Sequence, residues 1–158
     1  MTYNMTPSPS PASPPRRRGV GLPFVAIVGL AALGLPRAIL HDLHLIDDAG
    51  ILTWILALGP YAAWIAVAVA KRVPRPFLTV LLIGVTFGVM LVITHQLLWV
   101  QAFSGNLPAI GQGALATVIP RLAAVVSGLF TGAIIGAVGG LIAWGIRAAM
   151  TRSSIREG

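Results

Sequence analysis

The stretch from Leu122 to Ile146 carries no charged side chain and is bracketed by Arg121 and Arg147. A helix needs about 20 mainly apolar residues to cross a hydrocarbon core about 30 Å thick. Three further stretches have the same character, so the sequence predicts four spans at about residues 20–40, 51–70, 77–99 and 122–146. The strand-like alternation that a membrane barrel requires is absent from the sequence. The predicted fold class is therefore all-α, a polytopic membrane protein with four transmembrane helices in an antiparallel bundle.

The composition of the 158 residues supports this class and excludes others. Charged residues make up 9% of the chain, against about 25% in a soluble domain. The net charge of +7 could suggest a nucleic-acid partner, but the basic residues form short clusters beside the predicted spans, as membrane topology requires. The lipid bilayer is the expected partner and nucleic acid is not. The lack of cysteine removes disulfides, thiolate metal sites and thiol nucleophiles.

The distribution of the cations predicts the orientation, because cytoplasmic loops accumulate Lys and Arg. Four spans place both termini on one side, which would hold nine cations, whereas Arg37 and Arg121 lie on the other side. We therefore predict a multi-pass protein of the cell inner (plasma) membrane with a cytoplasmic N-terminus and a cytoplasmic C-terminus. Three units follow: a disordered Pro/Ser/Arg tail at 1–18, a membrane domain at 19–148 and a short basic cytoplasmic tail at 149–158.

Glycines recur every four residues along the last predicted span and form a glycine-zipper pattern. Such a stripe bares the backbone on one helix face, and close backbone approach promotes helix association in lipid. Two interpretations stay open: packing inside the four-helix bundle, or a homo-oligomer built on this face. The stripe consists of Gly128, Gly132, Gly136 and Gly140.

A proline lies midway along the second predicted span. Pro60 removes one helical hydrogen bond and predicts a kink. Broken helices line substrate sites in transporters, yet kinks are also tolerated where neighbouring helices satisfy the freed carbonyl. Span lengths place the hydroxyls of Tyr61, Thr86 and Thr131 near the bilayer midplane, where they could form a small polar site or simply bond within their own helices.

All three histidines fall on the predicted outer side of the membrane. His41 and His44 follow the first span at a spacing that can hold one ion, and His95 ends the third span and could add a third nitrogen. Structural roles compete with this metal or pH-sensing interpretation. Arg37 could pair with Asp42, and Asp47 or Asp48 could cap the second span, leaving the histidines with ordinary hydrogen bonds.

No motif in the sequence indicates catalysis, and we expect neither an enzyme nor a cofactor. The frequent Ala, Gly and Arg suggest a bacterial source. The expected function is that of a small structural or accessory membrane protein that packs through its glycine faces with itself or with a membrane partner. The alternatives are a small transporter or channel for an unknown solute, and an outer-side metal or pH sensor that uses His41, His44 and His95.

Overall fold

Six helices account for most of the computed structural model, which describes residues 19–47, 49–113 and 115–156. They are α1 (Phe24–Ala32), α2 (Leu35–Asp42), α3 (Ile51–Ala70), α4 (Pro76–Leu97), the short α5 (Trp99–Ala102) and α6 (Val118–Arg156). Four segments of the described chain are long and apolar enough to cross a membrane: α1 with α2, α3, α4, and α6 as far as Ser153. The all-α four-helix fold is confirmed. The predicted tail at 1–18 lies outside the described residues.

The ends of the spans differ from the prediction in three of four cases. The second span, Ile51–Ala70, is as predicted, but the first reaches Asp42, the third runs from Pro76 to Leu97, and α6 begins at Val118 and ends at Arg156. Hydropathy locates the apolar part of a helix, whereas backbone hydrogen bonds carry the helix on into polar residues. Residues 149–156, predicted as a tail, therefore continue α6.

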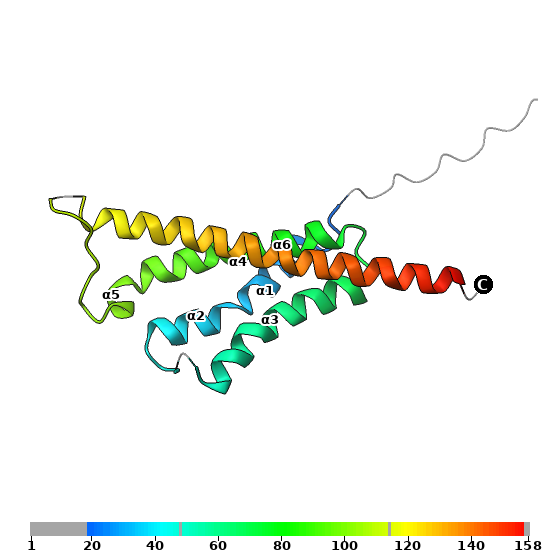
Figure 1. Ribbon diagram of the computed structural model, residues 1–158, viewed down its shortest axis with the longest axis horizontal. Coiled ribbons are helices and arrows are strands. Elements are labelled where there is room, and N and C mark those ends of the chain that lie inside the picture. Colours follow the sequence, from blue (N-terminus) through cyan, green and yellow to red (C-terminus); the bar gives the residue numbers. More distant parts are fainter. Residues whose placement is uncertain (1–18, 48, 114, 157–158) are drawn as a thin grey trace, which may run out of the picture.

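The longest contact in the fold is made by α4 and α6, which run antiparallel side by side (Figure 1). A Cβ atom added at Gly84 would lie 2.5 Å from the Cα of Gly136, and one added at Gly132 would lie 2.5 Å from the Cα of Gly88. At these positions backbone meets backbone, so any side chain would push the helices apart. The four glycines of the α6 stripe all face α4, at Phe77, Leu81, Gly84, Gly88 and Val92.

The first span is broken between α1 and α2, a feature that the sequence analysis did not predict. Pro36 lies in the first turn of α2 and has no N–H to continue the hydrogen bonding of α1. Gly34 precedes it because a Cβ there would lie 2.6 Å from the ring of Phe87. The indole nitrogen of Trp64 donates a hydrogen bond of 2.7 Å to the carbonyl of Leu30 near the end of α1, a carbonyl that also accepts from the N–H of Leu33.

Pro60, in contrast, lies inside α3 without interrupting the helix. It is buried, and the residue after it begins an aromatic cluster in the middle of the bundle. The ring centroids of Tyr61 and Trp64 are 5.1 Å apart, and those of Trp64 and Phe87 are 5.7 Å apart. These edge-on and tilted ring contacts pack α3 against α4 close to the break in the first span.

Candidate functional site

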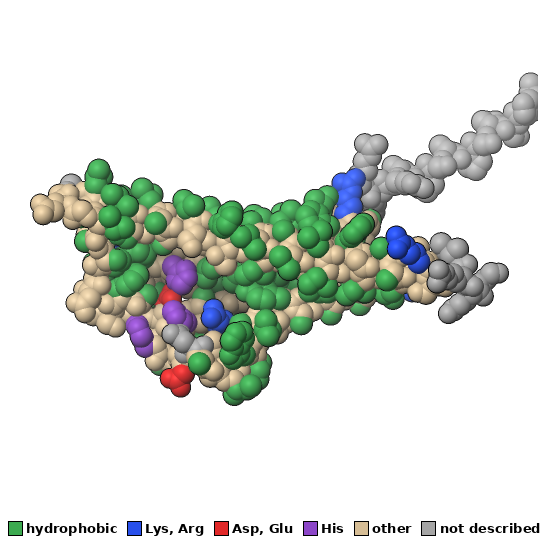
Figure 2. Space-filling model, in the orientation of Figure 1, with side chains coloured by type: hydrophobic (Ala, Val, Ile, Leu, Met, Phe, Trp, Pro, Cys, Tyr) green, Lys and Arg blue, Asp and Glu red, His purple; other side chains and the backbone are tan. Residues whose placement is uncertain are grey.

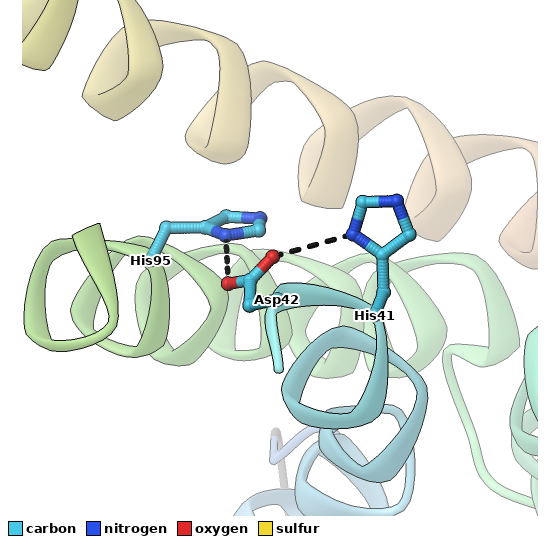
Figure 3. Close-up of polar contacts among 3 residues, drawn as sticks. All are labelled: His41, Asp42 and His95. Carbon is cyan, nitrogen blue, oxygen red and sulfur yellow. Dashed lines mark hydrogen bonds and ion pairs between the residues drawn. The ribbon is translucent and has the colours of Figure 1, made fainter. Parts of the chain in front are cut away.

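A buried carboxylate joins two histidines where α2 ends beside the last turn of α4 (Figure 3). Asp42 is only 3% exposed. One of its oxygens accepts a hydrogen bond of 2.5 Å from Nδ1 of His95, and the other accepts one of 3.3 Å from Nδ1 of His41. Both carboxylate oxygens are thus occupied by imidazole nitrogens from two different helices, α2 and α4.

The C-terminal end of α2 fixes this carboxylate in place. The N–H of Leu45 bonds to the carbonyl of Leu40 at 2.8 Å, and the N–H of His44 bonds to that of His41 at 2.9 Å. This pair is a Schellman cap, which needs a left-handed residue just after the helix. His44 takes that position with φ of 56°. The cap ends α2 directly after Asp42 and leaves its side chain inside the bundle.

A cavity of about 460 Å³ lies between α2, α3, α4, α5 and α6, and Asp42 and its two histidine partners line it. Its apolar wall includes Leu56, Phe87, Leu91 and Phe103. The volume lies within the range of small-molecule sites, about 300–1,000 Å³. Polar side chains from four helices line the same cavity: Arg37, His41, Asp42, Tyr61, His95, Ser127 and Thr131.

Arg37 brings a full positive charge into this cavity. It lies inside the first span, one helical turn before His41. Its Nε atom is buried and has no hydrogen-bond partner among the described residues. The sequence analysis paired Arg37 with Asp42, and this is wrong, because the carboxylate bonds to the two histidines instead.

Trp99 and Phe103 line one end of the cavity, and Arg121 packs against Trp99 without lining the cavity itself. Trp99 of α5 is 5% exposed and its ring centroid is 4.9 Å from that of Phe103. The guanidinium of Arg121 lies 5.2 Å from the Trp99 ring centroid, within the range of a cation–π contact. Gln96 donates a hydrogen bond of 3.2 Å to the carbonyl of Arg121. Both contacts hold the start of α6 against α4 and α5.

The three predicted metal ligands do not all share this cavity. His41 and His95 line it, whereas His44 lines a separate shallow depression with Asp47 and Thr53. Across the described ranges, no group of three or more His, Asp and Glu side chains is arranged to hold a metal ion. Space-filling Figure 2 shows the histidines gathered at one end of the molecule.

The structure also bears on the predicted Asp cap of the second span and on the three hydroxyls predicted near the bilayer midplane. Gly50 precedes α3 without a side-chain cap, and the hydroxyl of Thr53 donates a hydrogen bond of 2.6 Å to the carbonyl of Asp47, so the expected Asp47 cap is wrong. Asp48 lies outside the described residues. Of the three midplane hydroxyls, those of Tyr61 and Thr131 reach the cavity, while Thr86 bonds back to Leu82 within α4 at 2.8 Å.

The buried Asp42 is the residue that sequence reasoning placed wrongly. The predicted first span ends at about residue 40 and leaves Asp42 outside it, whereas Asp42 is the last residue of that span. The signal available was Pro36: a helix that starts there and runs its usual eight or more residues extends beyond Leu40. The partner, His95, comes from a helix 53 residues away in sequence, and no local pattern predicts that contact.

Comparisons of the chain with protein-family models, with curated proteins and with solved structures found no match. The class to which the protein belongs therefore follows from its own helices. It is a multi-pass α-helical membrane protein with a mainly apolar cavity between its helices, into which several polar side chains project.

Proposed function

We propose that the protein binds a small polar solute in the cavity between α2, α3, α4, α5 and α6. The function is one of binding or transport, the second of the functions that the sequence suggested, and not an enzymatic one. The observation that carries it is the buried Nε of Arg37, which has no hydrogen-bond partner among the described residues and belongs to a side chain lining a cavity of about 460 Å³. Charged side chains within membrane spans are costly and commonly mark substrate or ion pathways.

The glycine faces support this choice over a purely packing role. The stripe on α6 is covered along its length by α4 of the same chain. The face that could have served a homo-oligomer is thereby used to build the bundle. The cavity, in contrast, has polar side chains, Arg37, Tyr61, Ser127 and Thr131, that make no hydrogen bond to another described residue.

Access of solute to the cavity can be tested with single cysteines, because the chain has none of its own. Ala124 lines the cavity, whereas Val126, on the same helix, is 68% exposed and does not line it. A thiol reacts as the thiolate, which forms where water reaches it. We expect methyl methanethiosulfonate to modify Ala124→Cys in proteoliposomes at least about tenfold faster than Val126→Cys, which faces lipid.

The rates are measured by mass spectrometry of the intact protein at several reaction times. Gln112→Cys, in the exposed loop before α6, gives the rate of a fully hydrated thiol. If Ala124→Cys is as slow as Val126→Cys while Gln112→Cys reacts, the cavity is closed to water and the proposed binding function is wrong.

We further propose the orientation that the cations favour, with both termini in the cytoplasm of a cell with an inner membrane. In right-side-out membrane vesicles, an impermeant maleimide should label Gln112→Cys. It should label Ser153→Cys, which is exposed near the end of α6, only after detergent is added. The reverse pattern would invert the topology and place the cavity on the cytoplasmic side.

An accessory role remains a second candidate because of the length of α6. Its 39 residues span about 58 Å at 1.5 Å per residue, nearly twice the hydrocarbon core. The C-terminal part of α6 extends beyond the other helices (Figure 1), where it could contact a membrane partner. A closed cavity in the cysteine experiment would make this the better-supported function.

A further inference from the structure

Resting on the proposed binding function, we infer that the solute is a small anion, specifically a monocarboxylate with a short apolar part, and that Arg37 holds its charge. Arginine stays protonated in proteins, so its charge cannot be removed by burial. Arg37 as a whole is half-buried, but a guanidinium nitrogen that water does not reach needs an anion or another hydrogen-bond acceptor to satisfy it. The described side chains leave the Nε of Arg37 without such an acceptor.

The nearest acid in the cavity is already engaged. Each oxygen of Asp42 accepts a hydrogen bond from a different histidine. Its carboxylate therefore serves the contact between α2 and α4, and no ion pair with Arg37 accompanies these two. An entering carboxylate would supply the two coplanar oxygens that the forked guanidinium matches best.

Neutral hydrogen-bond donors from α3 and α6 line the same cavity. Tyr61 comes from α3, and Ser127 and Thr131 come from α6 one turn apart. Their hydroxyls make no hydrogen bond to any described residue, although side-chain bonds of this kind are present elsewhere on α4 and α6. Hydroxyl groups can donate to an anion without adding a charge, which suits the remaining oxygen lone pairs of a carboxylate.

The rest of the lining favours an apolar tail over an inorganic anion. Phe87, Leu91 and Phe103 border the same space. The cavity volume of about 460 Å³ exceeds what one hydrated chloride or phosphate requires and suits a ligand with an aliphatic or aromatic portion. Benzoate is a suitable probe, because benzamide has the same shape without the charge.

The test uses Ala124→Cys and two charged methanethiosulfonates, the sulfonatoethyl anion and the trimethylammonioethyl cation. We measure the ratio of their rate constants at Ala124→Cys and divide it by the same ratio at Gln112→Cys, which removes the influence of the outer surface. We expect a corrected preference of about tenfold for the anion, because a nearby charge acts strongly in a cavity of reduced dielectric.

Three variants assign the preference to Arg37. In the Arg37→Gln background the corrected ratio should fall to about one, while Arg37→Lys should keep most of it, since charge is retained. Arg147→Gln removes an arginine at the far end of α6, about 35 Å from Ala124 at 1.5 Å per residue, which does not line the cavity, and should leave the ratio unchanged. Arg37→Gln removes a charged group whose buried Nε has no described partner, so its thermal stability should not fall.

Protection by benzoate completes the test. Benzoate should slow the reaction of Ala124→Cys in a saturable way, and benzamide should not; the protection should disappear in Arg37→Gln. Equal reaction with both charged reagents, or equal protection by benzamide, would overturn the anion inference and leave the binding function standing. An Ala124→Cys that neither reagent reaches, beside a reactive Gln112→Cys, would overturn the binding function itself.

Discussion

Replacing Gly132 with alanine should lower the free energy of unfolding by about 2–3 kcal/mol, the upper range for an overpacked core. The added methyl group would lie 2.5 Å from the Cα and 2.6 Å from the backbone N of Gly88. Backbone atoms cannot rotate away as a side chain would. The variant must therefore separate α4 from α6 along the longest helix contact of the fold.

Gly145→Ala is the matched control for this prediction. It lies on the same helix, and an added Cβ would meet no atom within 4 Å. Alanine is the better helix former by about 1 kcal/mol, so this variant should be as stable as the natural chain or slightly more stable. Unfolding in mixed micelles of increasing dodecyl sulfate content measures both. Equal stability of the two variants would show that α4 and α6 do not approach at Gly132.

Replacing His95 with alanine should cost about 2 kcal/mol, because it leaves the carboxylate of Asp42 buried with one weaker partner. The bond to His95 is the shorter of the two, at 2.5 Å against 3.3 Å. Asp42 is 3% exposed, so water cannot fully replace the lost imidazole. The same unfolding in mixed micelles measures this variant, and the lost stability should appear as a lower dodecyl sulfate content at the unfolding midpoint.

A second substitution distinguishes the cost of leaving the Asp42 carboxylate buried without His95 from the cost of losing the packing of the His95 side chain. Removing the acid as well, in His95→Ala with Asp42→Leu, should recover a substantial part of the stability, since an apolar pair carries no desolvation cost. His44→Asn is the control: His44 lies beyond the end of α2 in a left-handed conformation that asparagine also adopts. If the double variant is less stable than His95→Ala alone, then Asp42 is not the source of the loss.

Much of the bundle could be predicted because a membrane span is recognisable from a local run of apolar residues. A run such as Leu122–Ile146 must be helical in lipid, since every backbone polar group needs an internal partner there. The spacing of Gly128, Gly132, Gly136 and Gly140 marked a face for close helix approach. The choice between a face inside the bundle and one between copies required the position of α4, which no local pattern contains.

The candidate site was harder to predict, for a physical reason. The polar residues were found as a group on one side of the membrane, but their partners were assigned by closeness in sequence. The sequence suggested that Arg37 could pair with Asp42 and that His41, His44 and His95 could share one ion, whereas in the fold Asp42 bonds to His41 and His95. The chain breaks at Gly34 and Pro36, which changes the direction of α2 and places Asp42 inside the bundle. Only glycine fits at position 34, because a Cβ there would collide with the ring of Phe87 on α4.

The sequence by itself determined the class of the protein: helical, multi-pass and built on glycine faces, because hydropathy and small-residue spacing act along a single helix. The tertiary structure alone decided which faces meet, which acid is buried and where the cavity lies. Those properties depend on contacts between residues far apart in the chain, such as Asp42 with His95 and Gly88 with Gly132. Arg37 became a candidate binding residue only when the described fold left its buried Nε without a partner.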